Sequence, residues 1–143
     1  MIAAQVRLAS GVAEVEQALE LRERVFCGEQ GVSPEADRDG RDSESAHIVA
    51  VSERRVVGTC RLLFHGRVAR LGRLAVEAEL RGRGVTGAIL READRVARDG
   101  GADQIALHAQ TYALSLYADH GYAERGARFF EEGIEHVAME KAL

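Results

Sequence analysis

The segment Arg81–Gly87, with the sequence RGRGVTG, has the composition of a binding site for phosphate groups. It follows an apolar stretch typical of a strand and begins a pattern typical of a helix. Its glycines let the backbone approach a ligand without interference from a Cβ atom. Free N–H groups at the start of a helix bind anions, and Arg81 and Arg83 add charge that suits a pyrophosphate. A plain glycine-rich turn is the alternative, and the segment alone favours neither.

The spacing of Gly82, Gly84 and Gly87 also matches the fingerprint of dinucleotide-binding domains. That fingerprint begins directly at the end of a strand, whereas residues 77–80 separate this strand from the glycines. The following strand ends at residues 107–109 without the expected carboxylate. A P-loop is excluded because no Gly-Lys-Ser/Thr follows the glycines.

The rest of the chain supplies the elements that must position this segment. β-Rich stretches predict strands at 2–8, 47–51, 56–64, 68–76, 104–108, 122–128 and 134–140. Helical periodicity predicts three helices, at 10–26, 85–100 and 113–121. Ser10 is expected to cap the first helix, in which only the stem of Arg22 joins the apolar face. Imperfect alternation around Gly72 suggests a bulge, and residues 28–45 read as an ordered, irregular loop near the substrate side. The order predicts an α+β fold with a mixed central sheet.

Length, charge and cysteine content narrow the class of protein. The 143 residues fit one domain spanning 1–143, and a net charge of −4 argues against non-specific nucleic-acid binding. No stretch approaches the roughly 18 apolar residues of a membrane helix, and the first residues lack the features of a signal peptide. Cys27 and Cys60 have no spacing that suggests a metal site or a disulfide. We therefore expect a soluble cytoplasmic protein without a metal.

Several motifs together resemble the GNAT superfamily of N-acetyltransferases. Arg81-x-x-Gly84-x-Thr86 is similar to its Gln/Arg-x-x-Gly-x-Gly/Ala acyl-CoA motif, and residues 116–122 (LYADHGY) are similar to its fYeklGF element. Residues 24–32 and 132–139 resemble the ElaA/YjcF-like branch. The matches cover nearly the whole chain in the expected order. Thr86 departs from the motif, where its side chain would either crowd the pyrophosphate or donate a hydrogen bond to it.

The resemblance implies a three-layer fold in which about four helices flank about seven strands. It also implies direct transfer of an acetyl group from acetyl-CoA to an amine on a small molecule or peptide. Strands 70–76 and 104–109 would separate to form the slot for acetyl-CoA, and the amide of Val76 would stabilise the thioester oxygen. The residues implied to bind acetyl-CoA are Leu74, Ala75, Val76, Arg81, Gly82, Arg83, Gly84, Val85, Thr86 and Gly87.

Tyr117 matches the general acid of the family, which protonates the departing CoA thiolate. The base is sought among Glu29, His47, Glu77 and His136, of which Glu29 and His136 are the preferred candidates. Either strand histidine is equally well explained as a hydrogen-bonded packing residue. The acidic residues of 29–44 fit a cationic acceptor, and a solvated loop is the alternative.

Two rival functions use the same fold: a non-catalytic acyl-CoA-binding module and an acyl-homoserine-lactone synthase. The resemblance is also compatible with a homodimer that forms through the late strands.

Overall fold

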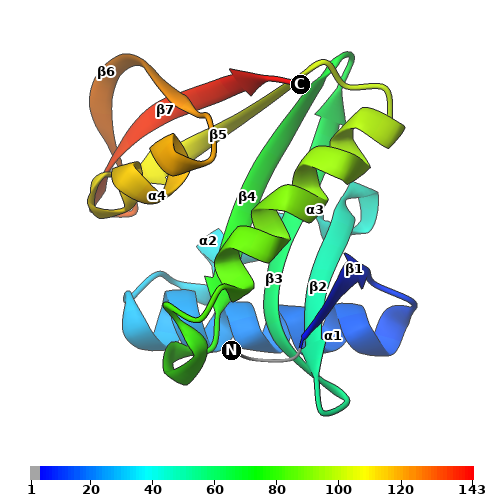
Figure 1. Ribbon diagram of the computed structural model, residues 1–143. Coiled ribbons are helices and arrows are strands. Elements are labelled where there is room, and N and C mark those ends of the chain that lie inside the picture. The colour runs from blue at the N-terminus through cyan, green and yellow to red at the C-terminus, as the bar shows by residue number, and fades with distance from the viewer. Residues whose placement is uncertain (1–3) are drawn as a thin grey trace.

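The computed structural model describes residues 4–143, and its centre is a seven-stranded sheet in the order β1-β2-β3-β4-β5-β7-β6 (Figure 1). Neighbouring strands are antiparallel except for β4 and β5. The strands are β1 Gln5–Leu8, β2 Ala46–Ser52, β3 Arg55–His65, β4 Val68–Val76, β5 Gln104–Gln110, β6 Ala123–Glu131 and β7 Ile134–Ala142. The mixed sheet of about seven strands is confirmed; residues 2 and 3 of the first predicted strand lie outside the described residues.

Four α-helices flank the sheet, the number that the resemblance implied; periodicity predicted three, and α2 lies in the segment 28–45 that was expected to be irregular. They are α1 Val12–Arg22, α2 Pro34–Asp37, α3 Val85–Asp99 and α4 Leu114–Asp119. A π-helical segment, Glu23–Glu29, continues α1. Short 3-10 turns occupy Asp42–Glu44, Ala78–Leu80 and Thr111–Ala113.

The helices divide the core into two layers, one on each face of the sheet. Ile89, Leu90 and Ala93 of α3 pack with strand residues in the larger cluster, which Tyr117 of α4 also joins. Ala18 and Leu21 of α1 pack with Val49, Val56 and Ala75 on the opposite face. The sheet is therefore covered on both sides, in agreement with the predicted three-layer fold.

The start of α1 differs from the prediction that Ser10 caps it. The helix begins at Val12 after Gly11, and no side chain caps its first N–H groups. Glu14 instead accepts a hydrogen bond from the Ser10 N–H at 2.8 Å and pairs with Arg7 at 2.6 Å. Glu14 thus binds the N–H that precedes the helix, and the first N–H groups of the helix itself have no side-chain acceptor.

A bulge in β4 confirms the irregularity predicted near Gly72. Thr59 of β3 pairs with Ala75, and Arg61 pairs with Gly72, so two residues of β4 oppose Cys60 alone. The first of the two, Arg73, has a left-handed φ of 55°. Its guanidinium donates to the carbonyl oxygens of Ala36 and Asp37, which supports this unusual backbone conformation.

Strands β4 and β5 pair over a short distance only. The paired segments are residues 68–70 of β4 and residues 104–106 of β5. Beyond Arg70 the two strands diverge, as their ribbons in Figure 1 show. The predicted separation of these strands is present, and it leaves one edge of β4 without a strand partner.

Candidate active site

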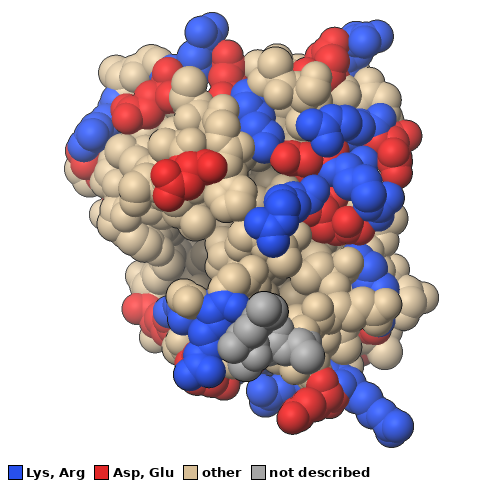
Figure 2. All heavy atoms as spheres, viewed as in Figure 1, with Lys and Arg blue, Asp and Glu red and all other residues tan. Residues whose placement is uncertain are grey.

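A cleft of about 670 Å³ opens where β4 and β5 separate. In Figure 2 the surface is hollowed beside the part of the molecule that holds α4 and β5, and basic residues lie below the hollow, over the segment leading to α3. Residues 70–76 of β4 line one wall, and Leu107, His108 and Gln110 of β5 line the other. The cleft is therefore bounded by the two strands that the sequence predicted to separate.

The glycine-rich segment lies at one end of this cleft. Gly82 and Gly84 have φ angles of 76° and 87°, which favour glycine over residues with a Cβ atom. Gly84 precedes α3, whose first turn has neither a side-chain cap nor an acidic residue. The N–H groups there have no competing side-chain acceptor, so the segment fits an anionic diphosphate.

Arg81 connects the glycine-rich segment to the cleft. Its Nε donates to the Val76 carbonyl at 3.0 Å, and its Nη1 lies 2.8 Å from Glu29 Oε1. Arg81 and Thr86 line the cleft, together with all three predicted residues of β4, Leu74 to Val76. The other predicted residues of the segment do not line the cleft: Gly82, Arg83 and Gly84 precede α3, and Val85 and Gly87 lie in its first turn.

The backbone at Val76 is directed toward the cleft. The N–H of the next residue, Glu77, donates to Val57 O on the β3 side at 2.9 Å. Because successive residues of a strand alternate, the N–H and C=O of Val76 are directed to the opposite edge, where Arg81 reaches the C=O. The Val76 N–H thus lies on the edge that β5 leaves unpaired.

Tyr117 lies on α4 and lines the cleft, although its side chain is 8% exposed. Its ring packs edge-on against Tyr122 at 5.8 Å between centroids. Burial, with a smaller effect of Cys60, raises the pKa of Tyr117 above its ordinary value. The hydroxyl therefore stays protonated at neutral pH and is able to act as a proton donor.

His136 is the one predicted base candidate that lines the cleft within the described residues. Its Nδ1 lies 2.7 Å from the Ile134 carbonyl, and its ring stacks on Phe129. A ring nitrogen beside a carbonyl oxygen must donate, so the lone pair of this imidazole is on Nε2.

The other three candidates are held by partners and lie outside the lining of the cleft. Glu29 pairs with Arg81, and Glu77 lies 2.6 Å from Arg24. Nε2 of His47 donates to the Asp42 carbonyl at 2.9 Å. None of the three residues lines the cleft.

The acidic loop that seemed suited to a cationic acceptor is occupied internally. Asp42 lies 2.7 Å from Arg22 and 3.1 Å from Arg61, and Asp39 lies 2.9 Å from Arg61. The hydrogen bond from Arg61 lowers the pKa of Asp39 well below its ordinary value. Asp37 pairs with Arg22 and, at 3.2 Å, with Arg73. Three arginines thus neutralise three aspartates.

The burial of Arg22, the last residue of α1, corrects the expectation that only its stem joins the apolar face. The whole Arg22 side chain is buried, not its stem alone. The partners that make this burial tolerable lie 15 and 20 residues further along the chain, so helical periodicity gave no sign of them.

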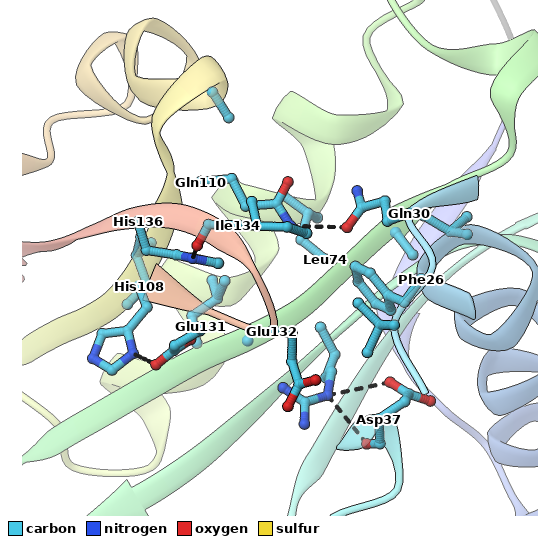
Figure 3. Close-up of a pocket in the computed structure, with 18 of the residues that line it drawn as sticks. Phe26, Gln30, Asp37, Leu74, His108, Gln110, Glu131, Glu132, Ile134 and His136 are labelled. Carbon is cyan, nitrogen blue, oxygen red and sulfur yellow. Dashed lines mark hydrogen bonds and ion pairs between the residues drawn. The ribbon is translucent and has the colours of Figure 1, made fainter. Parts of the chain in front are cut away.

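Four polar residues of the cleft escaped the sequence reasoning. Nδ1 of His108 lies 2.7 Å from Oε1 of Glu131, and the Gln110 amide donates to Gln30 at 2.9 Å (Figure 3). His108 and Gln110 alternate along β5 with the buried Ile105, Leu107 and Ala109. That alternation was the available signal, because it puts the two polar residues on one face of the strand.

Neither a membrane helix nor a metal cluster accompanies this cleft in the part of the chain that the structure describes. Within residues 4–143 no helix has the length and apolar character needed to cross a bilayer. Over the same range, no three His, Cys, Asp or Glu side chains are grouped so that they would hold a metal ion.

Known proteins share both the sequence and the architecture. Residues 13–143 match the family model of the acetyltransferase (GNAT) domain. The uncharacterized N-acetyltransferase YjcF of Bacillus subtilis is 35% identical over 135 residues, which cover 94% of this chain and 96% of the relative. A protein of known structure from Lactobacillus plantarum superposes with a TM-score of 0.91 at 26% identity, over 99% of both chains. Escherichia coli ElaA superposes with a TM-score of 0.84 at 25% identity, again over 99% of both chains.

Proposed function

Because this chain belongs to the GNAT acetyltransferase family, in the branch that includes YjcF and ElaA, we propose that it transfers an acetyl group from acetyl-CoA directly to a primary amine. The observation that carries the proposal is the separation of β4 from β5 beside the uncapped start of α3. Together these features offer an unpaired strand edge and an anion site at one cleft. The acceptor is a small molecule or a peptide that bears the amine.

The backbone holds the acyl donor in this proposal. The amides of residues 81–87 bind the pyrophosphate, with Arg81 and Arg83 adding positive charge. The free edge of β4 at Leu74–Val76 pairs with the pantetheine amides as a neighbouring strand would. Thr86 lines the same end of the cleft, where its hydroxyl is within the region assigned to the phosphates.

The chemistry at the thioester needs an electrostatic stabiliser and a proton donor. The acyl donor supplies an acetyl group that is activated as a thioester. The N–H of Val76, on the free edge of β4, stabilises the negative charge that develops on the thioester oxygen. Tyr117, which burial keeps protonated, gives its proton to the sulfur as the thiolate departs.

Glu29 and His136 remain the sequence-based candidates for the base. Glu29 reaches the cleft through its ion pair with Arg81, and we propose that it positions that guanidinium. His136 lines the cleft, but it is only 7% exposed, and its ring stacks on Phe129.

The predicted homodimer stays a prediction, as does the cytoplasmic location. Strand β6 forms one edge of the sheet and is exposed along most of its length, with Phe130 70% exposed. Such an edge is where a dimer built from the late strands would form.

Replacement of Tyr117 by Phe tests the proposal against a non-catalytic acyl-CoA-binding module. The variant removes only the hydroxyl, so we expect kcat to fall by roughly 10²–10⁴-fold while the Kd for acetyl-CoA is unchanged. Release of CoA thiol in the presence of small primary amines measures the first quantity, and calorimetry measures the second. Tight acetyl-CoA binding by wild type with no transfer to any amine would favour the binding module.

A further inference from the structure

We propose that His108 is the general base that takes the proton from the acceptor amine, and that Glu131 positions it. This inference rests on the proposed acetyltransferase function. His108 lies on β5 and Glu131 at the end of β6, yet their side chains point toward one another at the wall of the cleft (Figure 3). Their Nδ1 and Oε1 atoms are 2.7 Å apart.

Strand register puts His108 on the far side of the cleft from the bulge of β4. Ala106 is the last residue of β5 that pairs with β4, opposite Arg70. His108 lies two residues further along β5, where the corresponding position of β4 is Gly72, directly before the bulge. An acceptor that enters between the separated strands therefore passes between His108 and the strand that carries Val76.

The contact with Glu131 fixes the tautomer of His108. A carboxylate accepts hydrogen bonds, so Nδ1 carries the proton and Nε2 carries the lone pair. Phe129 packs edge-on against the imidazole at 4.9 Å and restricts its rotation. The side chain of His108 is 38% exposed and lines the cleft, so its ring is accessible from the cleft. His136, by contrast, is almost fully buried.

Several charged groups act on His108 from the elements around it. Glu131 and Glu132 of the β6–β7 hairpin favour the protonated imidazole, whereas Arg70 and Arg73 of β4 oppose it. His136 of β7 is the other titratable ring at this wall. Of these five groups, Glu131 is the one in direct contact.

The proton balance of the step is complete with the groups on the cleft. The neutral amine attacks the thioester carbon, and its proton passes through water in the cleft to Nε2 of His108 as the C–N bond forms. The C–S bond breaks with its electron pair going to sulfur, which takes a proton from Tyr117. Solvent then returns the imidazolium and the tyrosinate to their starting states, so no net proton is consumed.

The test compares pH profiles of kcat/KM for variants of the pair. The acceptor probes are an alkyl diamine, an amino sugar, an amino acid and a lysine peptide, each with acetyl-CoA. Wild type is expected to gain activity as pH rises through the pKa of the base. His108→Gln should lose roughly 10²–10⁴-fold in kcat/KM and lose this rise with pH. His65→Gln, at the exposed end of β3, is the matched control and should keep the wild-type profile.

Glu131→Gln separates a positioning role from a merely structural one. Removal of the carboxylate leaves the tautomer and the orientation of the imidazole unfixed, so kcat/KM at neutral pH should fall, though by less than in His108→Gln. Glu132→Gln removes the same charge but leaves the hydrogen bond in place, so its loss should be smaller. Nitrogen NMR of the His108 ring should also show the proton on Nδ1 in wild type and a mixture of tautomers in Glu131→Gln.

The outcomes separate this inference from the function on which it rests. If wild type acetylates a probe and His108→Gln keeps both the rate and the pH profile, the role of His108 is wrong although the enzyme stands. Loss of the pH-dependent rise in His136→Gln alone would assign the base to His136 instead. If wild type acetylates none of the probes, the proposed function fails, and the role of His108 fails with it.

Discussion

Arg22 is a charged side chain that is buried in the protein. Its ion pairs show how the loop of residues 28–45 is held beside the cleft. Its side chain is 1% exposed and contacts Asp37, which is 2% exposed, and Asp42. Arg61 and Arg73 join the same aspartates from β3 and β4. The network therefore ties α1, the loop and the bulged strand together beside the cleft.

Removal of Arg22 should be far more damaging than removal of an exposed arginine. Arg22→Ala removes the most buried of the arginines that neutralise Asp37 and Asp42, so we expect a loss of about 3–5 kcal/mol in the free energy of unfolding. Arg95, an exposed residue of α3 with two ion pairs, is the matched control, and Arg95→Ala should cost only a small fraction of that loss because solvent screens its charge. Urea denaturation measures both. Equal losses in the two variants would contradict the structural role given to this network.

At the scale of elements, the start of α1 and the bulge of β4 show where sequence patterns succeed and where they fail. The periodicity of apolar residues and the turn residues predicted the seven strands and the helices α1, α3 and α4. Buried positions recur every second residue in a strand and every three to four residues in a helix, so the sequence itself shows them. They also predicted a bulge at Gly72, because alternation fails there. They assigned the wrong cap at Ser10, because the helix begins one residue later, after Gly11, and the Ser10 N–H donates to Glu14.

Glu14 should therefore stabilise α1 more than Ser10 does. Hydrogen bonds from Arg7 and from the Ser10 N–H lower the pKa of Glu14 to about 2. A folded-state pKa below the unfolded one contributes stability above about pH 4.3, and this contribution is lost as pH falls toward the folded value. Glu14→Gln should thus cost about 1 kcal/mol at pH 7, as loss of a helix cap does, and progressively less from about pH 5 down to about pH 2.5.

Denaturation of wild type, Glu14→Gln and Ser10→Ala across this pH range measures the effect. Ser10→Ala retains the backbone N–H that Glu14 uses, so it should stay within about 0.5 kcal/mol of wild type. A larger loss in Ser10→Ala than in Glu14→Gln would restore the serine as the cap.

At the scale of the whole molecule, the cleft joins parts of the chain that are far apart in sequence. The glycine-rich segment and Tyr117 were predictable because their motifs are local and resemble those of a known family. The pair of His108 and Glu131 was not, because a β-hairpin and a strand 23 residues earlier bring the two side chains together. The same holds for the acidic loop. Its aspartates pair with Arg22, Arg61 and Arg73, which are distant in sequence, so the sequence did not indicate these ion pairs.

The central claim is that the start of α3 and the free edge of β4 bind acetyl-CoA, and calorimetric titration of acetyl-CoA tests it most directly. The key variant combines Arg81→Ala with Gly84→Asp, which removes the cation and introduces a carboxylate at the proposed phosphate site. Gly101→Asp is the matched control, because Gly101 also has a left-handed φ, of 90°, but lies after α3 and away from the cleft. Circular dichroism confirms that each variant is folded.

We expect wild type and Gly101→Asp to bind acetyl-CoA with similar affinity, and the folded double variant to lose at least about tenfold, since charge-assisted contacts to a phosphate are among the stronger hydrogen bonds. Unchanged binding by the double variant, or no binding by wild type, would contradict the account.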